Sequence, residues 1–340
     1  MTGMKKLVAA LPLASFLAGC AHVPDVTMGY YLPRSAVSFK VIRTVACDAA
    51  DNPIIATAVT PTVKHSADPA KQYRVALSQL KGSLSDSDVK FEFYEDGRLS
   101  AVNASSTGQG EAILKTAITL ATAVFAFDGG PQAHPKECAA IKAFGGGKPL
   151  TLTYEGDIDL TQPPTSAQAL EPDTASTYYA NALAGVMQGV YAFVGDTRKP
   201  DAPTSYSPAS SDVVVRARQP GAVRIKVTVG KGTLDNDDVI WNDFVPVAQI
   251  GTDYDLPIPK PATFGKEIFS AVFAESGALK SVQYARNTGT GQALNVANAG
   301  LTALQGDSAA TQAANVKAEA DLIAQQQRLV SCIANPSGCK

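Results

Sequence analysis

A short strand–turn–strand pattern occurs twice in this chain, and it constrains the fold more than any other feature. Residues 89–104 and 268–285 each read as two strands around a turn, at 95–98 and 275–278, and each is followed by a Gly-x-Gly turn. Five matches share an offset of 180 residues, and three more follow after one inserted residue: Phe93 with Phe273, Glu95 with Glu275, Gly97 with Gly277, Leu99 with Leu279, Val102 with Val282, Thr107 with Thr288, Gly108 with Gly289, and Gly110 with Gly291. The pattern predicts a duplicated hairpin. Chance is the alternative, because turns recruit the same residues in unrelated proteins.

Helical sequence follows each copy of the hairpin. Residues 111–127 and the stretch from 291 toward 304 are rich in Ala and Leu after the glycine turns. We therefore expect an α+β fold of two related units, 20–160 and 212–305, each an antiparallel β-sheet with a hairpin followed by a packing helix.

The expected units are joined by residues 161–211, whose Pro, Ser, Thr and Asp content at both ends is typical of a linker. Within this segment residues 177–194 are apolar and uncharged, which predicts a helix that is buried or bridges the units. Insertion into a membrane is the alternative. Residues 306–340 predict a C-terminal amphipathic helix, with Val316, Ala320, Ile323 and Val330 on its apolar stripe, and a turn bounded by cysteines.

The first twenty residues have the pattern of an export signal. Lys5 and Lys6 precede a short apolar run that ends in Leu17-Ala18-Gly19-Cys20. This ending resembles the lipobox of bacterial lipoproteins. The resemblance implies that residues 1–19 are a signal peptide removed by a dedicated peptidase, and that Cys20 carries fatty-acyl chains such as palmitate. Ala21 stands where inner-membrane lipoproteins of this class carry Asp, so the resemblance implies an outer-membrane anchor.

An even number of cysteines remains once Cys20 is assigned to the lipid, and an oxidising compartment permits disulfides between them. The strong turn at Asn335-Pro336-Ser337-Gly338 favours a bridge between Cys332 and Cys339. Cys47 would then pair with Cys138, although the count alone allows three connectivities. Metal binding is the alternative, but the chain has no Cys-x-x-Cys motif and no suitably spaced histidine.

Motifs for catalysis and cofactor binding are incomplete. The turns at 108–110 and 289–291 lack the third small residue of a dinucleotide fingerprint, since Ile113 and Leu294 occupy its place. Ser78 and Lys81 have Ser-x-x-Lys spacing without the other motifs of that chemistry. The chain holds three histidines, at 22, 65 and 134, without an evident nucleophile nearby. We therefore expect no cofactor, and leave enzymatic activity uncertain with a preference against it.

Two further segments have both a structural and a functional interpretation. The acidic clusters at 86–88 and 235–238 fit solvated turns better than a calcium loop, because Ile240 and Pro246 stand where such a loop needs Gly and Glu. The proline-rich run 256–261 fits either a segment presented to a partner or an edge strand protected by proline.

The balance of 29 Lys and Arg against 31 Asp and Glu argues against a nucleic-acid partner. We expect a periplasm-facing outer-membrane lipoprotein, with the cell surface as the alternative face, that binds or scaffolds within the envelope. Its expected partners are the membrane, through the lipid, and another envelope protein. The alternative is an envelope hydrolase or small-ligand carrier with a site between the two units.

Overall fold

The computed structural model describes residues 25–80, 89–104, 121–126, 133–209, 213–259, 266–287, 309–336 and 339. These residues form two antiparallel β-sheets, three α-helices and one short 3-10 helix, Leu77–Leu80. The strands are β1 (Thr27–Cys47), β2 (Pro53–Ala76), β3 (Lys90–Phe93), β4 (Leu99–Ala104), β5 (Ala121–Ala126), β6 (Leu150–Ile158), β7 (Gln168–Pro172), β8 (Gly189–Arg198), β9 (Val213–Gly230), β10 (Asp238–Ile258), β11 (Lys266–Phe273) and β12 (Leu279–Asn287). The helices are α1 (Pro135–Phe144), α2 (Thr177–Ala182) and α3 (Ala309–Ala334).

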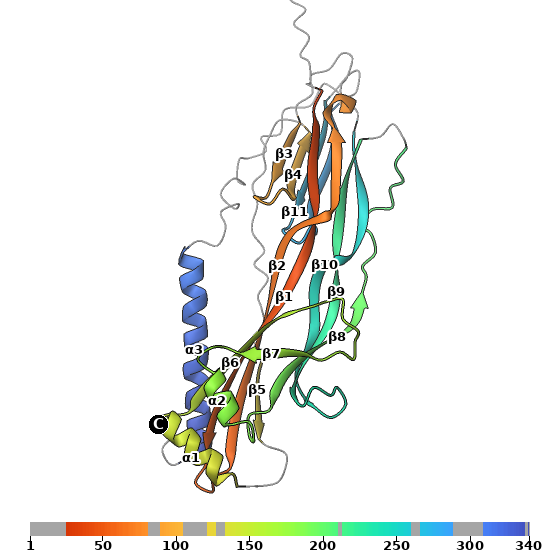
Figure 1. Ribbon diagram of the computed structural model, residues 1–340. Coiled ribbons are helices and arrows are strands. Elements are labelled where there is room, and N and C mark those ends of the chain that lie inside the picture. Colours follow the sequence, from red (N-terminus) through yellow and green to blue (C-terminus); the bar gives the residue numbers. More distant parts are fainter. Residues whose placement is uncertain are drawn as a thin grey trace, which may run out of the picture.

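Two long hairpins, β1–β2 and β9–β10, give the molecule its elongated shape (Figure 1). They belong to one eight-stranded sheet with the order β10-β9-β8-β7-β6-β1-β2-β5. The strands extend this far because apolar residues alternate with polar ones over most of their length, which suits a sheet with one buried face. The order places the two hairpins toward opposite ends of the sheet, yet β1 and β2 contact β9 and β10, so the sheet folds over onto itself.

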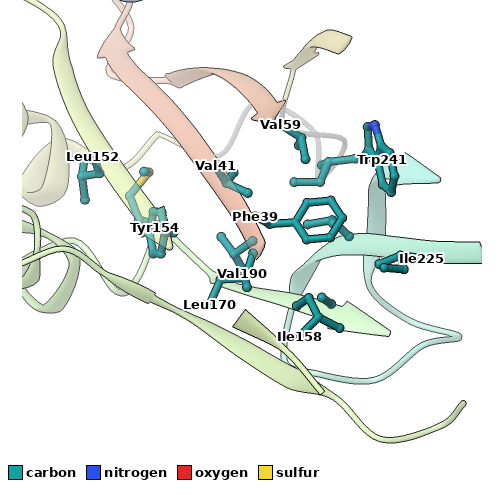
Figure 2. Close-up of a cluster of buried hydrophobic side chains, with 14 of the residues drawn as sticks. Phe39, Val41, Val59, Leu152, Tyr154, Ile158, Leu170, Val190, Ile225 and Trp241 are labelled. Carbon is teal, nitrogen blue, oxygen red and sulfur yellow. The ribbon is translucent and has the colours of Figure 1, made fainter. Parts of the chain in front are cut away.

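The main core lies between the two halves of this folded sheet (Figure 2). Phe39 on β1 meets Trp241 on β10 edge to face, with 5.1 Å between the ring centroids. Leu152, Leu170 and Val190 come from the strands that connect the hairpins. Residues from both predicted units and from the predicted linker therefore share one core.

The second sheet has four strands, in the order β12-β11-β4-β3, and it joins the two repeated hairpins. Ala271 on β11 pairs with Val102 on β4. Both hairpins contain the same register shift, with Phe93 opposite Leu99 and Phe273 opposite Leu279. The hairpin repeat is therefore matched in local structure, but the expected fold of two separate α+β units is wrong, because the described chain is mostly strand and its hairpins share sheets.

The two turns of the repeated hairpins are also alike in backbone conformation. Gly97 and Gly277 have φ angles of 83° and 86°, in the left-handed region that favours glycine. Gly97 donates its amide hydrogen to the carbonyl of Tyr94, and Gly277 donates to the carbonyl of Ala274, at 2.9 and 2.8 Å. Glycine is thus required at both positions by the same turn geometry.

The predicted linker is part of the main sheet, to which it contributes β7 and β8. The helix expected over 177–194 is likewise corrected: α2 ends at Ala182, and Gly189 begins strand β8. Val190, Ala192 and Val194 are buried on alternate positions, so the segment has the period of a strand. Residues 121–126, expected to be helical, pair with β2 as β5. The remainder of that expected helix and the one after residue 291 lie outside the described residues.

The C-terminal helix α3 was expected, and it packs against the outer face of β1, β2 and β6 (Figure 1). Leu322, Gln326 and Val330 of this helix are buried. Of the residues expected on the apolar stripe, Val330 is buried and Ile323 half-buried, whereas Val316 and Ala320 are exposed. No helix in the described part of the chain is long and apolar enough to span a membrane.

Candidate functional site

A cluster of charged and polar side chains lies where the repeated hairpins meet the long strands. The amide of Tyr31 on β1 donates to the carbonyl of Gly97 at 3.2 Å, and Arg98 donates through Nη1 to the carbonyl of Glu275. Beside these turns is a crevice with about 20 Å³ of room, enough for one water molecule. It is lined by Tyr30, Tyr31, Leu32, Pro33, Leu99, Arg216, Ala217, Arg218, Phe273 and Gly277.

Two arginines of β9 form paired contacts with aspartates of β10 beside this crevice. Arg216 donates through Nε and Nη2 to the carboxylate of Asp255 at 2.8 and 2.6 Å, and this hydrogen bonding raises the pKa of the guanidinium. Arg218, which is buried, donates through Nε to Asp253 at 2.7 Å and through Nη1 to the carbonyl of Pro33 at 3.2 Å. Because each carboxylate already accepts hydrogen bonds from an arginine, both carboxylates have a structural role.

A serine and a histidine face each other on the neighbouring hairpin. Ser35 and His65 are cross-strand partners, and the serine Oγ lies 3.0 Å from the histidine Nδ1. Burial, with a smaller contribution from the Arg98 cation, lowers the pKa of His65 to about 4. The same Oγ accepts the amide hydrogen of Ala248 at 2.9 Å, and Ser35 is only 2% exposed. A nucleophile must reach its substrate, so the buried Ser35 hydroxyl is arranged to join strands rather than to attack a bond.

A second buried cation lies inside the main core. The Arg43 guanidinium donates through Nη1 to the carbonyl of Gln188 at 2.7 Å, and its Cζ lies 6.0 Å from the centroid of the Tyr154 ring. Burial lowers the pKa of Arg43 and raises that of Tyr154. No carboxylate among the described residues forms an ion pair with Arg43. Its position fastens the segment before β8 to the Cys47 end of β1.

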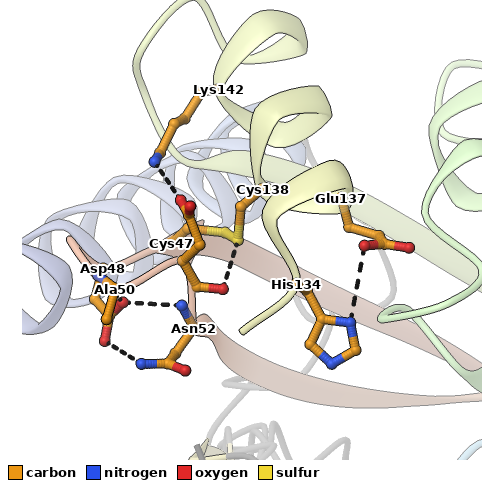
Figure 3. Close-up of a disulfide and its surroundings, with 9 residues drawn as sticks. Cys47, Asp48, Ala50, Asn52, His134, Glu137, Cys138 and Lys142 are labelled. Carbon is orange, nitrogen blue, oxygen red and sulfur yellow. Dashed lines mark hydrogen bonds and ion pairs between the residues drawn. A yellow bond between two sulfur atoms is a disulfide. The ribbon is translucent and has the colours of Figure 1, made fainter. Parts of the chain in front are cut away.

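Four cysteines expected to form disulfides do so in the structure. Cys47 at the end of β1 is joined to Cys138 of α1 (Figure 3), and Cys332 is joined to Cys339. The first bridge lies beside an ion pair in which Lys142 Nζ is 2.8 Å from Asp51 Oδ1. Both bridges therefore stabilise the structure. The first closes the end of the long β1–β2 hairpin that lies next to α1.

The acidic cluster at 235–238 organises the turn between β9 and β10. The Asp237 carboxylate accepts amide hydrogens from Lys231, Gly232 and Thr233, at 2.9, 2.7 and 3.0 Å. These backbone bonds oppose the effect of partial burial and lower the pKa of Asp237. Within the ranges that the structure covers, no group of three or more His, Cys, Asp or Glu side chains is placed to hold a metal ion.

Residues 256–258 of the proline-rich run end β10, an edge strand of the main sheet, and residues 260 and 261 lie outside the described residues. Leu256 and Ile258 are buried in a second core beneath the four-stranded sheet. The edge-strand interpretation of this run is therefore the one that agrees with the structure.

Several sequence candidates fall outside the described residues, namely His22, Cys20, Lys81, the cluster 86–88 and the glycine turns 108–110 and 289–291. Of the rest, Ser78 lies in the short 3-10 helix, and His134 precedes α1, where its Nδ1 is 3.8 Å from Glu137. Neither Ser78 nor His134 joins the cluster around Arg216 and Arg218.

The arginine–aspartate pairs of β9 and β10 were not among the residues expected to form a site. A signal is present in the alternation, because arginines stand at positions 216 and 218, aspartates at 253 and 255, and opposite charges on facing strands stabilise a sheet. Comparison with protein-family models, with curated proteins and with solved structures gives no match for this chain.

Proposed function

We propose that this protein is a lipid-anchored envelope protein that acts without catalysis, as a rigid spacer or scaffold that carries a binding surface away from the membrane. The observation that carries the proposal is the path of β1. This strand runs without a break from Thr27, close in sequence to the lipobox cysteine, to Cys47 at the opposite end of the molecule (Figure 1). Its 21 residues correspond to a length of about 70 Å at ~3.3 Å per residue.

The anchor in this proposal is Cys20, seven positions before Thr27. Such a segment reaches at most about 25 Å when fully extended, so the Thr27 end stays near the bilayer. The other end, with α1, α2 and the Cys47–Cys138 bridge, then has room to stand well away from the membrane. Several acyl chains on one cysteine are sufficient for stable anchoring.

The side chains of the described site support a structural role. Ser35 is buried, and the carboxylates of Asp253 and Asp255 accept hydrogen bonds from arginines. The crevice between the hairpins is far smaller than the roughly 300 Å³ typical of a site for an organic substrate. Stiffness comes from the shared core, the paired arginines and two disulfides.

Energy transfer from protein to membrane tests this arrangement. A donor dye is attached through an alkyne-bearing amino acid at position 71, on the Thr27 end, or at position 148, just after α1. Lys71 and Lys148 are both exposed, so each site accepts a label. The lipidated protein is reconstituted in vesicles that contain acceptor-labelled lipid.

We expect strong transfer from position 71 and weak transfer from position 148. Equal transfer from both positions would mean that the long axis of the protein lies flat on the membrane, and would contradict the spacer proposal. The Cys20→Ser variant is the control for the anchor: it should show little transfer from either position. If this variant stays bound to washed membranes, the anchor assignment is wrong.

A further inference from the structure

Two arginines lie against one phenylalanine on the outer face of the main sheet. The Cζ atoms of Arg198 and Arg224 are 3.7 and 4.6 Å from the centroid of the Phe244 ring. Arg224 and Phe244 are cross-strand partners on β9 and β10, and Arg198 is the last residue of the adjacent β8. Val223 and Ile225, on either side of Arg224, are fully buried, so the alternation turns Arg224 away from the core.

Neither guanidinium forms an ion pair with a carboxylate in the described part of the chain, in contrast to Arg98, Arg216 and Arg218. The carboxylate next to Phe244 in sequence, that of Asp243, accepts the amide hydrogen of Phe244 at 2.7 Å. The Nε atom of Arg224 is buried and has no hydrogen-bond partner among the described residues, so its terminal nitrogens are the donors that a ligand can reach. Two cations held near one ring repel each other, and an anion that contacts both would offset this repulsion.

We propose that Arg198, Arg224 and Phe244 form a binding site for a phosphoryl group carried by a soluble molecule. Ring contact fixes the planes of both guanidinium groups, which leaves their N–H donors available in a fork that matches phosphate oxygens. A phosphoryl group carries close to two negative charges, which balances two arginines, whereas a single carboxylate would leave one of them uncompensated. The site lies on strands β8, β9 and β10 and does not depend on the lipid anchor.

Equilibrium dialysis with radiolabelled inorganic phosphate measures binding directly. The full-length protein is purified in detergent and dialysed at constant ionic strength, with chloride as the competing anion. We expect saturable binding of one phosphate per chain. The Arg198→Gln and Arg224→Gln variants should each bind about tenfold more weakly, because each loses one charged set of donors.

The matched control is Arg74→Gln, which removes the same charge from an exposed position on β2. It should bind phosphate as the unchanged protein does. Arg198 is exposed, so its variant should fold normally, which circular dichroism and the unfolding midpoint will verify; this keeps the test valid if Arg224→Gln unfolds. Absence of saturable binding, full binding by Arg198→Gln, or equal loss in Arg74→Gln would each overturn the proposal.

Vesicle flotation distinguishes a soluble source of the phosphoryl group from a lipid headgroup. The Cys20→Ser protein and the Cys20→Ser, Arg198→Gln double variant are mixed with phosphatidylglycerol vesicles. We expect equal flotation of the two proteins. Flotation that depends on Arg198, without dialysis binding of inorganic phosphate, would assign the site to a membrane surface and contradict the soluble source.

Discussion

The side-chain amide of Gln249 on β10 binds both backbone groups of Ser35 on β1. Its Oε1 accepts the Ser35 amide hydrogen at 2.7 Å, and its Nε2 donates to the Ser35 carbonyl at 2.9 Å. Pairing of β1 with β6 begins only at Val37, so these groups of Ser35 lie beyond the end of that ladder. Gln249 thus takes the place of a neighbouring strand and holds the two long hairpins together.

Replacing Gln249 with Ala should lower the free energy of unfolding by about 1–3 kcal/mol, because two backbone groups lose their partners. Urea denaturation followed by Trp241 fluorescence measures this change. Gln249→Glu is the informative comparison, since its carboxylate can accept from the Ser35 amide but cannot donate to the Ser35 carbonyl. This variant should be less stable than the unchanged protein. Unchanged stability of Gln249→Ala would show that the clamp contributes nothing.

The two disulfides should differ in their contribution to stability. Cys47–Cys138 closes a loop of 91 residues and Cys332–Cys339 one of 7, so the chain-entropy relation gives about 4–5 and about 2 kcal/mol. Paired Cys→Ser replacements of each bridge, compared by guanidinium denaturation without reductant, measure both values. A larger loss from the short bridge than from the long one would contradict this ranking.

The two repeated turns provide a matched pair of glycine substitutions. Both glycines have positive φ, so alanine is strained at either position by about 1–2 kcal/mol. At Gly97 the added Cβ would lie 3.3 Å from the Tyr31 ring, whereas at Gly277 it would lie 2.5 Å from Pro33 Cγ and 2.9 Å from the Arg218 carbonyl oxygen.

Gly277→Ala should therefore lower the thermal unfolding midpoint clearly more than Gly97→Ala. Differential scanning calorimetry of both variants gives the comparison. Equal midpoints would mean that Pro33 moves aside without loss, so that turn strain alone decides both substitutions.

Stability should decrease as the pH falls from about 6.5 toward 4, through the effect of His65. The pKa of its imidazole is lowered to about 4 in the folded protein, against an ordinary value near 6.5. Between these values the unfolded chain binds the proton and the folded chain does not, so acidification favours unfolding.

We expect the loss attributable to His65 to be about 1–2 kcal/mol, since the ring is partly exposed and solvent screens part of the effect. Urea denaturation at pH 7 and pH 4.5, for the unchanged protein and for His65→Asn, measures it. The variant should show a smaller decrease between the two pH values. An identical decrease in both proteins would assign the pH dependence to other groups.

Local features were predictable because they depend on neighbouring residues. Gly97 and Gly277 mark their turns through the backbone conformation that glycine permits, and the proline turn before Cys339 favours a nearby bridge. Residues 177–194 were misread because an apolar run has no intrinsic preference between a buried helix and a buried strand. The pairing of β8 with β7 and β9 decides that question, and those partners are distant in sequence.

The sequence by itself determined the repeated hairpin and the C-terminal helix, since periodicity and turn residues act within a few positions of each other. It is also the sole basis for the proposed lipid anchor. Only the tertiary structure decided that the two copies form one body. Backbone N–H and C=O groups at the edge of each hairpin need hydrogen-bond partners. The partners of β4 are on β11, and those of Ser35 are on Gln249. Such partners lie more than 150 residues away along the chain, beyond the reach of any local pattern.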